Sequence, residues 1–316
     1  MNFYMAPLEG ITGYIYRNAY HTYFPDFDKY FTPFLAPHSE KEKLTHRERM
    51  DIAPEHNEGL YVVPQILTNQ SSQFIRVAKQ LQALGYEEVN LNLGCPSKTV
   101  VTKYKGAGFL AKPEELERFL TEIFEGLSMR ISIKTRLGMD DTGEFGELLT
   151  IFEQFPLEEL IIHPRLCREL YRGAPHREVF HQAVTQSKQR LCYNGDLFLK
   201  DHITTFREEE PSVARIMLGR GLLRNPGILE CIGTGSMPEI KKIKEFHDRL
   251  YKDYKQVMPG DRPTLFKMKE LWFYMGTLFT GWEENYAKQM RKASRLSDYE
   301  QIVNMVFSSE RYSDKI

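Results

Sequence analysis

The chain has 316 residues, of which 41% are hydrophobic and 27% are charged. This composition is typical of a soluble globular protein, and no apolar run is long enough to cross a bilayer. The formal net charge of −1 argues against a nucleic-acid-binding surface spread over the whole molecule, although a local basic patch remains compatible with it. The N-terminal residues lack the basic and apolar segments of a secretory signal, so we expect a cytoplasmic protein with no membrane association.

Eight short β-branched or apolar runs occur in the first 220 residues, and each is followed by a turn and a helical pattern. The runs are 3–8, 29–34, 61–66, 88–93, 130–136, 159–163, 190–194 and 215–218. Between them, 71–84 and 113–127 have apolar residues every three or four positions, as amphipathic helices do. Strand and helix therefore alternate through this part of the chain.

Eight such units fit within the roughly 250 residues that a (β/α)8 TIM barrel needs. An open doubly wound sheet that binds a dinucleotide usually has GxGxxG after its first strand, and this chain has no such motif there. We therefore predict an α/β fold with a TIM barrel over residues 1–236.

Strand signals stop near residue 237, and helical periodicity continues through 239–258, 263–280, 283–295 and 297–307. Residues 237–316 contain 15 Lys and Arg against 12 Asp and Glu. We predict a second domain here, a small and mildly basic C-terminal helical bundle.

Polar side chains interrupt the predicted strands at their carboxyl ends, where the catalytic groups of TIM barrels gather. Asn90 and Asn92 are two positions apart in the fourth strand, so they share a face, and Cys95 follows on the next loop. Gln65 stands near the end of the third strand. These side chains predict a binding site at the mouth of the barrel.

Two further strand ends carry cations with the same spacing. Lys134 and Arg136 share a face at the end of the fifth strand, and His163 and Arg165 repeat the pattern in the sixth. An unpartnered buried cation is costly, so these residues indicate an anionic or electron-rich ligand. The alternative is structural ion pairing with carboxylates such as those of Glu9 or Asp196.

The last two strands lead into glycine-containing turns, Asn194-Gly195-Asp196 and Gly219-Arg220-Gly221. In TIM barrels the loops after strands seven and eight commonly bind phosphate through backbone amides. The alternative for both is a tight turn between strand and helix.

The four cysteines show no paired spacing, so the sequence predicts neither a disulfide framework nor a metal site. We assign Cys167, Cys192 and Cys231 to the core. Cys95 lies instead between Gly94 and a proline at the barrel mouth. A thiol with an ordinary pKa near 8.5 is mostly protonated at neutral pH, which suits a catalytic acid.

Six motifs, in this order along the chain, resemble those of the tRNA-dihydrouridine synthases. They are Met5-Ala6-Pro7-Leu8-Glu9-Gly10-Ile11-Thr12, Asn92-Leu93-Gly94-Cys95-Pro96-Ser97, Lys134-Thr135-Arg136, His163-Pro164-Arg165, Asn194-Gly195-Asp196 and Gly219-Arg220-Gly221. The second and third motifs are the specific ones.

The resemblance implies an enzyme that holds FMN, reduces it with NADPH or NADH, and transfers hydride to C6 of a tRNA uracil while Cys95 protonates C5. The implied flavin-binding residues are Ala6, Pro7, Gln65, Lys134, His163, Asn194, Asp196, Gly219 and Arg220. The implied substrate-binding residues are Asn92, Arg136 and Arg165. No protein partner is implied.

Two departures from the family pattern stand out. The family commonly has His-Gly-Arg-Thr where this chain has His163-Pro164-Arg165-Leu166, which changes the turn and removes a hydroxyl. The opening has leucine where methionine is usual, a volume-conserving change.

The helical tail resembles an RNA-binding arm, since its cations suit phosphate contacts while the barrel receives one extruded base. These cations are Lys241, Lys242, Lys244, Lys267, Lys269, Lys288, Arg291, Lys292 and Arg295. The alternative for any one of them is a solvated helix surface.

Two other functions compete with this interpretation. An FMN-dependent barrel similar to dihydroorotate dehydrogenase would reduce a small metabolite and would not need a basic tail. A non-catalytic RNA-binding or scaffold protein would not need the polar strand ends.

Overall fold

The computed structural model describes residues 1–37, 44–309 and 311–313. The chain divides into two compact units. The first contains Met1–Tyr14, Phe27–Asp196 and Arg207–Leu218, and the second contains Ile15–Asp26, Leu197–Phe206 and Gly219–Ile316.

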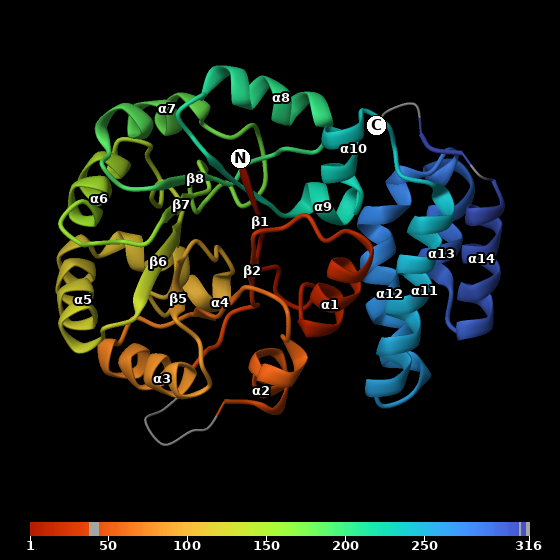
Figure 1. The fold of residues 1–316 in the computed structure, drawn as a ribbon, viewed down its shortest axis with the longest axis horizontal. Coiled ribbons are helices and arrows are strands. Elements are labelled where there is room, and N and C mark those ends of the chain that lie inside the picture. The colour runs from red at the N-terminus through yellow and green to blue at the C-terminus, as the bar shows by residue number, and fades with distance from the viewer. Residues whose placement is uncertain (38–43, 310, 314–316) are drawn as a thin grey trace. The chain divides into compact units, whose positions relative to one another are not determined.

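A parallel sheet forms the centre of the first unit (Figure 1). Its strands are β1 (Asn2–Met5), β2 (Lys29–Phe31), β3 (Val62–Val63), β4 (Gln65–Ile66), β5 (Glu88–Leu93), β6 (Arg130–Thr135), β7 (Leu160–Ile162), β8 (Leu191–Tyr193) and β9 (Arg215–Leu218). The strands are hydrogen-bonded in the order β3-β2-β1-β9-β8-β7-β6-β5-β4. The order places β3 and β4 at opposite ends of the series.

Pro64 explains how this series closes into a barrel. The two end strands, β3 and β4, are consecutive in sequence and are separated by Pro64 alone, which has no amide hydrogen to donate. Val62 is in register with Tyr30 of β2, whereas Gln65 is in register with Asn90 of β5. The segment 62–66, interrupted at Pro64, thus pairs with β2 through its first part and with β5 through its second. The eight predicted strands therefore close into a (β/α)8 barrel, which confirms the predicted fold class.

Helices follow the strands along the chain (Figure 1). In the first unit they are α2 (His46–Ile52), α3 (Ser71–Ala83), α4 (Lys98–Val101), α5 (Pro113–Gly126), α6 (Glu144–Phe152) and α7 (Arg177–Gln186), with short 3-10 turns at Pro54–His56 and Gly106–Ala111. Wholly or mostly in the second unit are α1 (Tyr14–Tyr23), α8 (Lys200–Glu209), α9 (Arg220–Arg224) and α10 (Ile228–Thr234). In α5, Pro113 occupies the first turn, and Leu116, Phe119 and Ile123 are buried along one face.

The interior of the barrel is apolar at its centre. Its core cluster contains Tyr4, Ala6, Phe31, Val63, Ile161, Cys192 and Met217. Cys192 is fully buried there, and Cys167 and Cys231 are also buried, as predicted, while all four cysteines are free.

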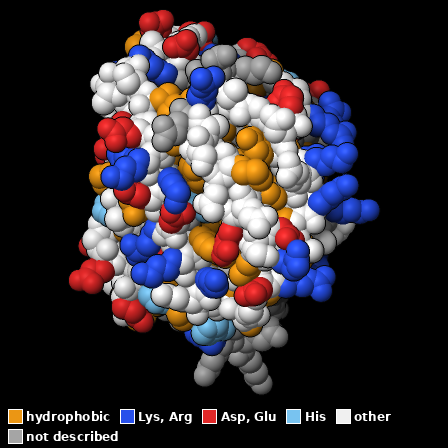
Figure 2. All heavy atoms as spheres, turned by 90° about the vertical axis from the view of Figure 1, so that its right-hand side faces the viewer, with side chains coloured by type: hydrophobic (Ala, Val, Ile, Leu, Met, Phe, Trp, Pro, Cys, Tyr) orange, Lys and Arg blue, Asp and Glu red, His pale blue; other side chains and the backbone are white. Residues whose placement is uncertain are grey.

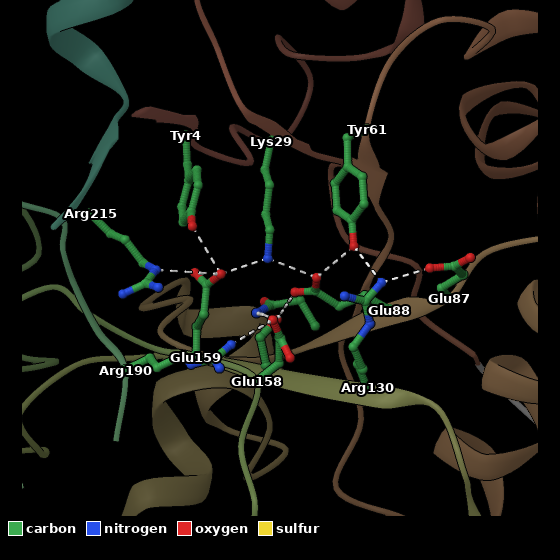
Figure 3. Close-up of polar contacts among 12 residues, drawn as sticks. Tyr4, Lys29, Tyr61, Glu87, Glu88, Arg130, Glu158, Glu159, Arg190 and Arg215 are labelled. Atoms are coloured by element: carbon green, nitrogen blue, oxygen red, sulfur yellow. Dashed lines mark hydrogen bonds and ion pairs between the residues drawn. The ribbon is translucent and has the colours of Figure 1, made fainter. Parts of the chain in front are cut away.

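A network of charged and tyrosine side chains covers the amino ends of the strands (Figure 3). Lys29 at the start of β2 lies 2.8 Å from a carboxylate oxygen of Glu88 and 2.6 Å from one of Glu159. Tyr4 donates to Glu159 at 2.9 Å, and Tyr61 donates to Glu88 at 3.2 Å. Burial opposes the charge on Lys29, but the two carboxylates outweigh it and raise the pKa of the lysine.

In the second unit, the C-terminal helices pack on one another (Figure 1). They are α11 (Ile240–Val257), α12 (Asp261–Met275), α13 (Ala287–Lys292) and α14 (Leu296–Ser308). Within their core, Trp272 donates to the Tyr299 hydroxyl at 2.9 Å, and His247 contacts the same hydroxyl at 2.5 Å. The predicted helix 283–295 begins instead with a π-helical turn, Trp282–Tyr286, and its helical part ends at Lys292.

Across the described parts of the chain, no helix combines the length and the apolar character that crossing a membrane requires.

Candidate active site

A cavity of about 110 Å³ lies at the carboxyl ends of the barrel strands. It is lined by Pro7, Leu8, Glu9, Phe34, Gln65, Asn92, Gly94, Cys95, Pro96, Lys134, Arg136, His163 and Tyr171. The structure thus brings together seven of the predicted site residues from five different strand ends.

A chain of side-chain amides fixes the polar wall of this cavity. Asn92 donates to Gln65 at 2.6 Å, Gln65 donates to Asn90 at 2.8 Å, and Asn90 donates to Ser132 at 2.9 Å. All four side chains are buried. Because each amide is oriented by the next, Gln65 and Asn92 present fixed donors and acceptors to a ligand.

Asn92 also shapes the loop that carries Cys95. Its side-chain oxygen accepts the backbone N–H groups of Gly94 at 3.1 Å and Cys95 at 2.9 Å. The Cys95 carbonyl in turn accepts the Ala107 amide at 3.0 Å. The position of the thiol is therefore set from both sides of the loop.

Gly106 is required where the chain passes close to Cys95. Its φ of +55° lies in the left-handed region, and a Cβ at this residue would lie 2.8 Å from the Cys95 carbonyl oxygen. The sequence interpretation missed this residue. The signal was present in the Gly106-Ala107-Gly108 string, although nothing local shows that Gly106 packs against Cys95, eleven positions earlier.

The Cys95 thiol is protonated at neutral pH. Burial raises its pKa, and Glu9 adds to this, while a hydrogen bond from the Ser97 amide and the charges of Arg136 and Lys134 act in the opposite direction. The net shift is upward, so the side chain carries a proton that it can donate.

Lys134 is a partly buried cation with no counter-charge among the described residues. Burial, followed by repulsion from Arg136, lowers its pKa to about 7. Among the described residues its ammonium group has no hydrogen bond or ion pair, although the side chain lines the cavity. An anionic or electron-rich ligand placed there would relieve this cost.

Arg136 connects the Cys95 loop to the loop that follows β7. Its Nε donates to the Gly94 carbonyl at 2.9 Å, and one terminal nitrogen donates to the Leu166 carbonyl at 2.9 Å. The guanidinium carbon lies 5.3 Å from the centre of the Tyr171 ring. Leu166, which stands where the family commonly has threonine, therefore contributes its backbone carbonyl while its side chain is buried.

Arg165 does not line the cavity. Its side chain is fully buried, pairs with Asp196, and donates to the backbone carbonyls of Arg172 and Gly173. The structural ion pair left open by the sequence thus occurs here between Arg165 and Asp196.

The remaining predicted residues occupy several environments. His163 lines the cavity at the end of β7, and Pro7 lines it at the loop after β1. Ala6 is buried, with its amide bonded to the Leu218 carbonyl at 2.8 Å, and Asn194 donates to the Met217 carbonyl at 2.8 Å. Neither of these two lines the cavity.

Gly219 and Arg220 belong to the second compact unit. Gly219 is the N-cap of α9, and the Arg220 guanidinium lies 5.4 Å from the Phe198 ring centre. Their predicted part in phosphate binding stays a prediction.

Two aromatic residues of the cavity wall, Phe34 and Tyr171, were not anticipated. Phe34 lies at the end of the predicted second strand and could have been found there. Tyr171 lies in the long segment between β7 and α7, where the sequence has no periodic signal.

A family model described as dihydrouridine synthase matches residues 4–304. A probable tRNA-dihydrouridine synthase of Staphylococcus aureus strain COL is 27% identical over 243 residues, which are 72% of this chain and 70% of that protein. Probable tRNA-dihydrouridine synthase 2 of Bacillus subtilis strain 168 is 27% identical over 243 residues, covering 72% and 71%.

Among solved structures, one of morphinone reductase aligns with a TM-score of 0.50 at 12% identity, covering 74% of this chain and 86% of that one. A variant of NCR from Zymomonas mobilis also gives 0.50 at 12% identity, covering 76% and 90%. At this identity the likeness concerns the fold alone. The family match covers the barrel, Cys95 and most of the helical tail, and the chain belongs to the dihydrouridine synthase family.

Proposed function

We propose that this protein is a tRNA-dihydrouridine synthase, which reduces the C5=C6 bond of uridines in tRNA. The observation that carries the proposal is the protonated Cys95 thiol, held by Asn92 at the mouth of the barrel beside an uncompensated Lys134. This arrangement combines an acid with a place for an electron-rich ligand. The family of the chain and the names of its relatives support the same reaction.

The residues at the cavity fit a flavin mononucleotide. The test is Lys134, whose partly buried ammonium has no partner among the described residues and whose pKa is lowered to about 7. The groups proposed to hold FMN are the backbone at Ala6 and Pro7, with Gln65, Lys134, His163, Asn194, Asp196, Gly219 and Arg220. FMN reduced by NADPH or NADH would supply the hydride that adds to C6 of the uracil.

Cys95 completes the reduction. Hydride addition at C6 leaves an electron pair at C5, and the thiol donates its proton there, so that the double bond is saturated and a thiolate remains. The charges of Arg136 and Lys134, both of which lower the pKa of this thiol, stabilise the thiolate until solvent returns the proton. Asn92 and Arg136, which line the cavity, are proposed to contact the uracil base.

Arg165 is proposed to influence the substrate indirectly. Its donors are directed to Asp196 and to the carbonyls of Arg172 and Gly173, so it holds the loop after β7 in place. This arrangement favours an organising role over a direct phosphate contact.

The C-terminal residues 237–316 are proposed to form the tRNA-binding domain. On α12, the Arg262 guanidinium lies 5.6 Å from the Phe266 ring centre, and Phe266 and Phe273 are exposed. Cations beside exposed aromatic rings suit an RNA backbone with accessible bases. Figure 2, which faces the right-hand side of Figure 1, shows Lys and Arg side chains gathered along its right edge.

The proposal is tested by mapping dihydrouridine in tRNA from cells that lack the gene and carry wild-type protein, Cys95→Ala or Cys231→Ala. Cys231 is also a free cysteine but is buried in the second unit, so its variant serves as the matched control. We expect wild type and Cys231→Ala to restore dihydrouridine at particular positions and Cys95→Ala to leave them unmodified. If wild type restores no position while the purified protein binds FMN, the activity on tRNA is refuted and a small metabolite becomes the substrate to test.

A further inference from the structure

Tyr171 stands at the mouth of the cavity as a half-exposed aromatic ring. It lines the cavity and is 49% exposed, in the loop between β7 and α7. Its ring centre lies 6.0 Å from that of His163, with an angle of 35° between the planes. A large aromatic side chain is normally buried more than this, so the exposure calls for an explanation.

Charged side chains hold the loop that carries this ring. Arg165, with no exposed side-chain surface, donates to the Gly173 carbonyl at 2.7 Å and also to that of Arg172. At the other end of the loop, Glu169 accepts the Leu166 amide at 2.7 Å and lies 2.7 Å from His176. The loop that carries Tyr171 is thus held by side-chain contacts at both of its ends.

The backbone beside the ring is also in an unfavourable conformation. Leu170 has a φ of +56°, which costs a non-glycine residue about 1 kcal/mol or more. On the other side, the Arg136 guanidinium lies 5.3 Å from the ring centre. The exposed Tyr171 ring is therefore flanked by a strained residue, Leu170, and held near two buried arginines, Arg136 and Arg165.

We propose that Tyr171 is a substrate-binding residue that stacks on a nucleobase of the RNA, at the entrance to the cavity. Unpaired bases stack on aromatic rings and on arginine planes, and this ring already lies over a guanidinium. Arg136 increases the rigidity of the ring, and the braced loop fixes its position before the RNA arrives. This inference rests on the proposed action on tRNA and adds to it a residue that none of the motifs contains.

The test compares Tyr171→Ala and Tyr171→Phe with the matched control Tyr104→Ala. Tyr104 is 50% exposed, has a φ of +51° and lies 5.0 Å from Lys112 Nζ, but it does not line the cavity. We expect Tyr171→Ala to raise both the tRNA dissociation constant and KM roughly 10- to 100-fold. Tyr171→Phe keeps the ring and should stay within about threefold of wild type, as should Tyr104→Ala.

Thermal unfolding and oxidation of NADPH with oxygen as acceptor, both without tRNA, show whether the fold and the cofactor are intact. Loss of kcat in Tyr171→Ala at an unchanged dissociation constant, or equal losses in Tyr171→Ala and Tyr104→Ala, would overturn the stacking role. If wild-type protein forms no dihydrouridine on any tRNA, the proposed function itself fails. The two failures are therefore distinguishable.

Discussion

Two partly buried lysines at opposite ends of the same barrel lie in contrasting electrostatic environments. Lys29, at the amino ends of the strands, lies within 2.8 Å of Glu88 and 2.6 Å of Glu159, and its pKa is raised (Figure 3). Lys134, near the carboxyl end of β6, has no such partner among the described residues, and its pKa is lowered to about 7. The same side chain is stabilised as a cation at one end and destabilised at the other.

The difference separates the part of the barrel that maintains the fold from the part that binds. In TIM barrels the amino ends of the strands serve stability, and the carboxyl ends carry the active site. A matched set of charges needs no ligand, whereas an unmatched buried cation lowers stability until a ligand of suitable charge arrives. Replacing each lysine by methionine, which keeps the length of the side chain but removes its charge, tests this separation directly.

The largest effect is expected at the amino ends. Lys29→Met would leave Glu88 and Glu159 facing each other without the lysine between them, and their side chains are only 1% and 3% exposed. Breaking a buried ion pair from one side costs about 3–5 kcal/mol. We expect the free energy of unfolding, measured by urea denaturation at pH 7, to fall by about that amount.

Glu87→Ala provides the control within the same network. Glu87 pairs with Arg130 at 2.7 Å, but the two side chains are 76% and 43% exposed. An exposed pair contributes at most about 1 kcal/mol. Equal losses for Lys29→Met and Glu87→Ala would show that the buried pairs do not stabilise the fold more than an exposed one.

At the mouth, the same substitution should have the opposite sign. Lys134→Met removes a charge that burial opposes, so the cofactor-free protein should gain about 1–3 kcal/mol at pH 7. Because the pKa of Lys134 is lower in the folded than in the unfolded protein, this gain should be complete below pH 7 and should shrink as the pH rises toward 10. Urea denaturation at pH 6.5 and pH 9.5 measures it. A loss of stability at pH 6.5 would contradict the comparison.

The alternation of strands and helices was readable from the sequence because each barrel strand is a short apolar run followed by an amphipathic helix. β5 and β9 begin and end at the predicted residues. The predicted strand 61–66 is interrupted at Pro64, which the chain uses to join the two edges of the sheet. A proline inside an apolar run predicts such an interruption. The local sequence does not show which strands pair with the two parts of the run, β2 and β5.

The site was predictable where it follows strand geometry and not where it depends on loops. Cys95, Lys134 and His163 lie at strand ends, so their meeting at one end of a parallel barrel follows from the topology. Tyr171 and the Lys29–Glu159 pair depend on how distant segments pack, and the paired residues are separated by 130 positions. No local pattern encodes such contacts.

Changing pH sharpens the interpretation of Lys134 as a ligand-binding cation. With a pKa of about 7 in the free protein, this group is charged at pH 6 and mostly neutral at pH 9. The isoalloxazine ring of FMN offers hydrogen-bond acceptors, which should favour the protonated form of Lys134, so the affinity should fall as the pH rises above 7, by up to about tenfold per pH unit. Fluorescence titration measures the affinity between pH 6.5 and 9. Lys134→Arg, which stays charged throughout, should show a flatter profile, and parallel profiles would exclude Lys134 as the titrating group.

The smallest effect is expected where the charges that hold the Tyr171 loop are partly exposed. A hydrogen bond from His176 to Glu169 raises the pKa of the histidine, and both side chains are about one-quarter exposed, at 28% and 23%. Since the folded-state pKa exceeds the ordinary value of 6.5, the added stability should be complete below pH 6.5 and should disappear as the pH rises through the folded-state value.

Glu169→Gln keeps the side-chain oxygen that accepts the Leu166 amide but removes the charge opposite His176. Solvent screening limits the expected loss to about 0.5–1 kcal/mol at pH 6, with less at pH 8.5, in urea denaturation at the two pH values. Glu178→Gln, which changes a carboxylate that is 67% exposed and 3.2 Å from the same imidazole, should have a smaller effect. An equal loss at both pH values would mean that the charge of His176 does not brace the Tyr171 loop, leaving Arg165 as the buried charge that holds it.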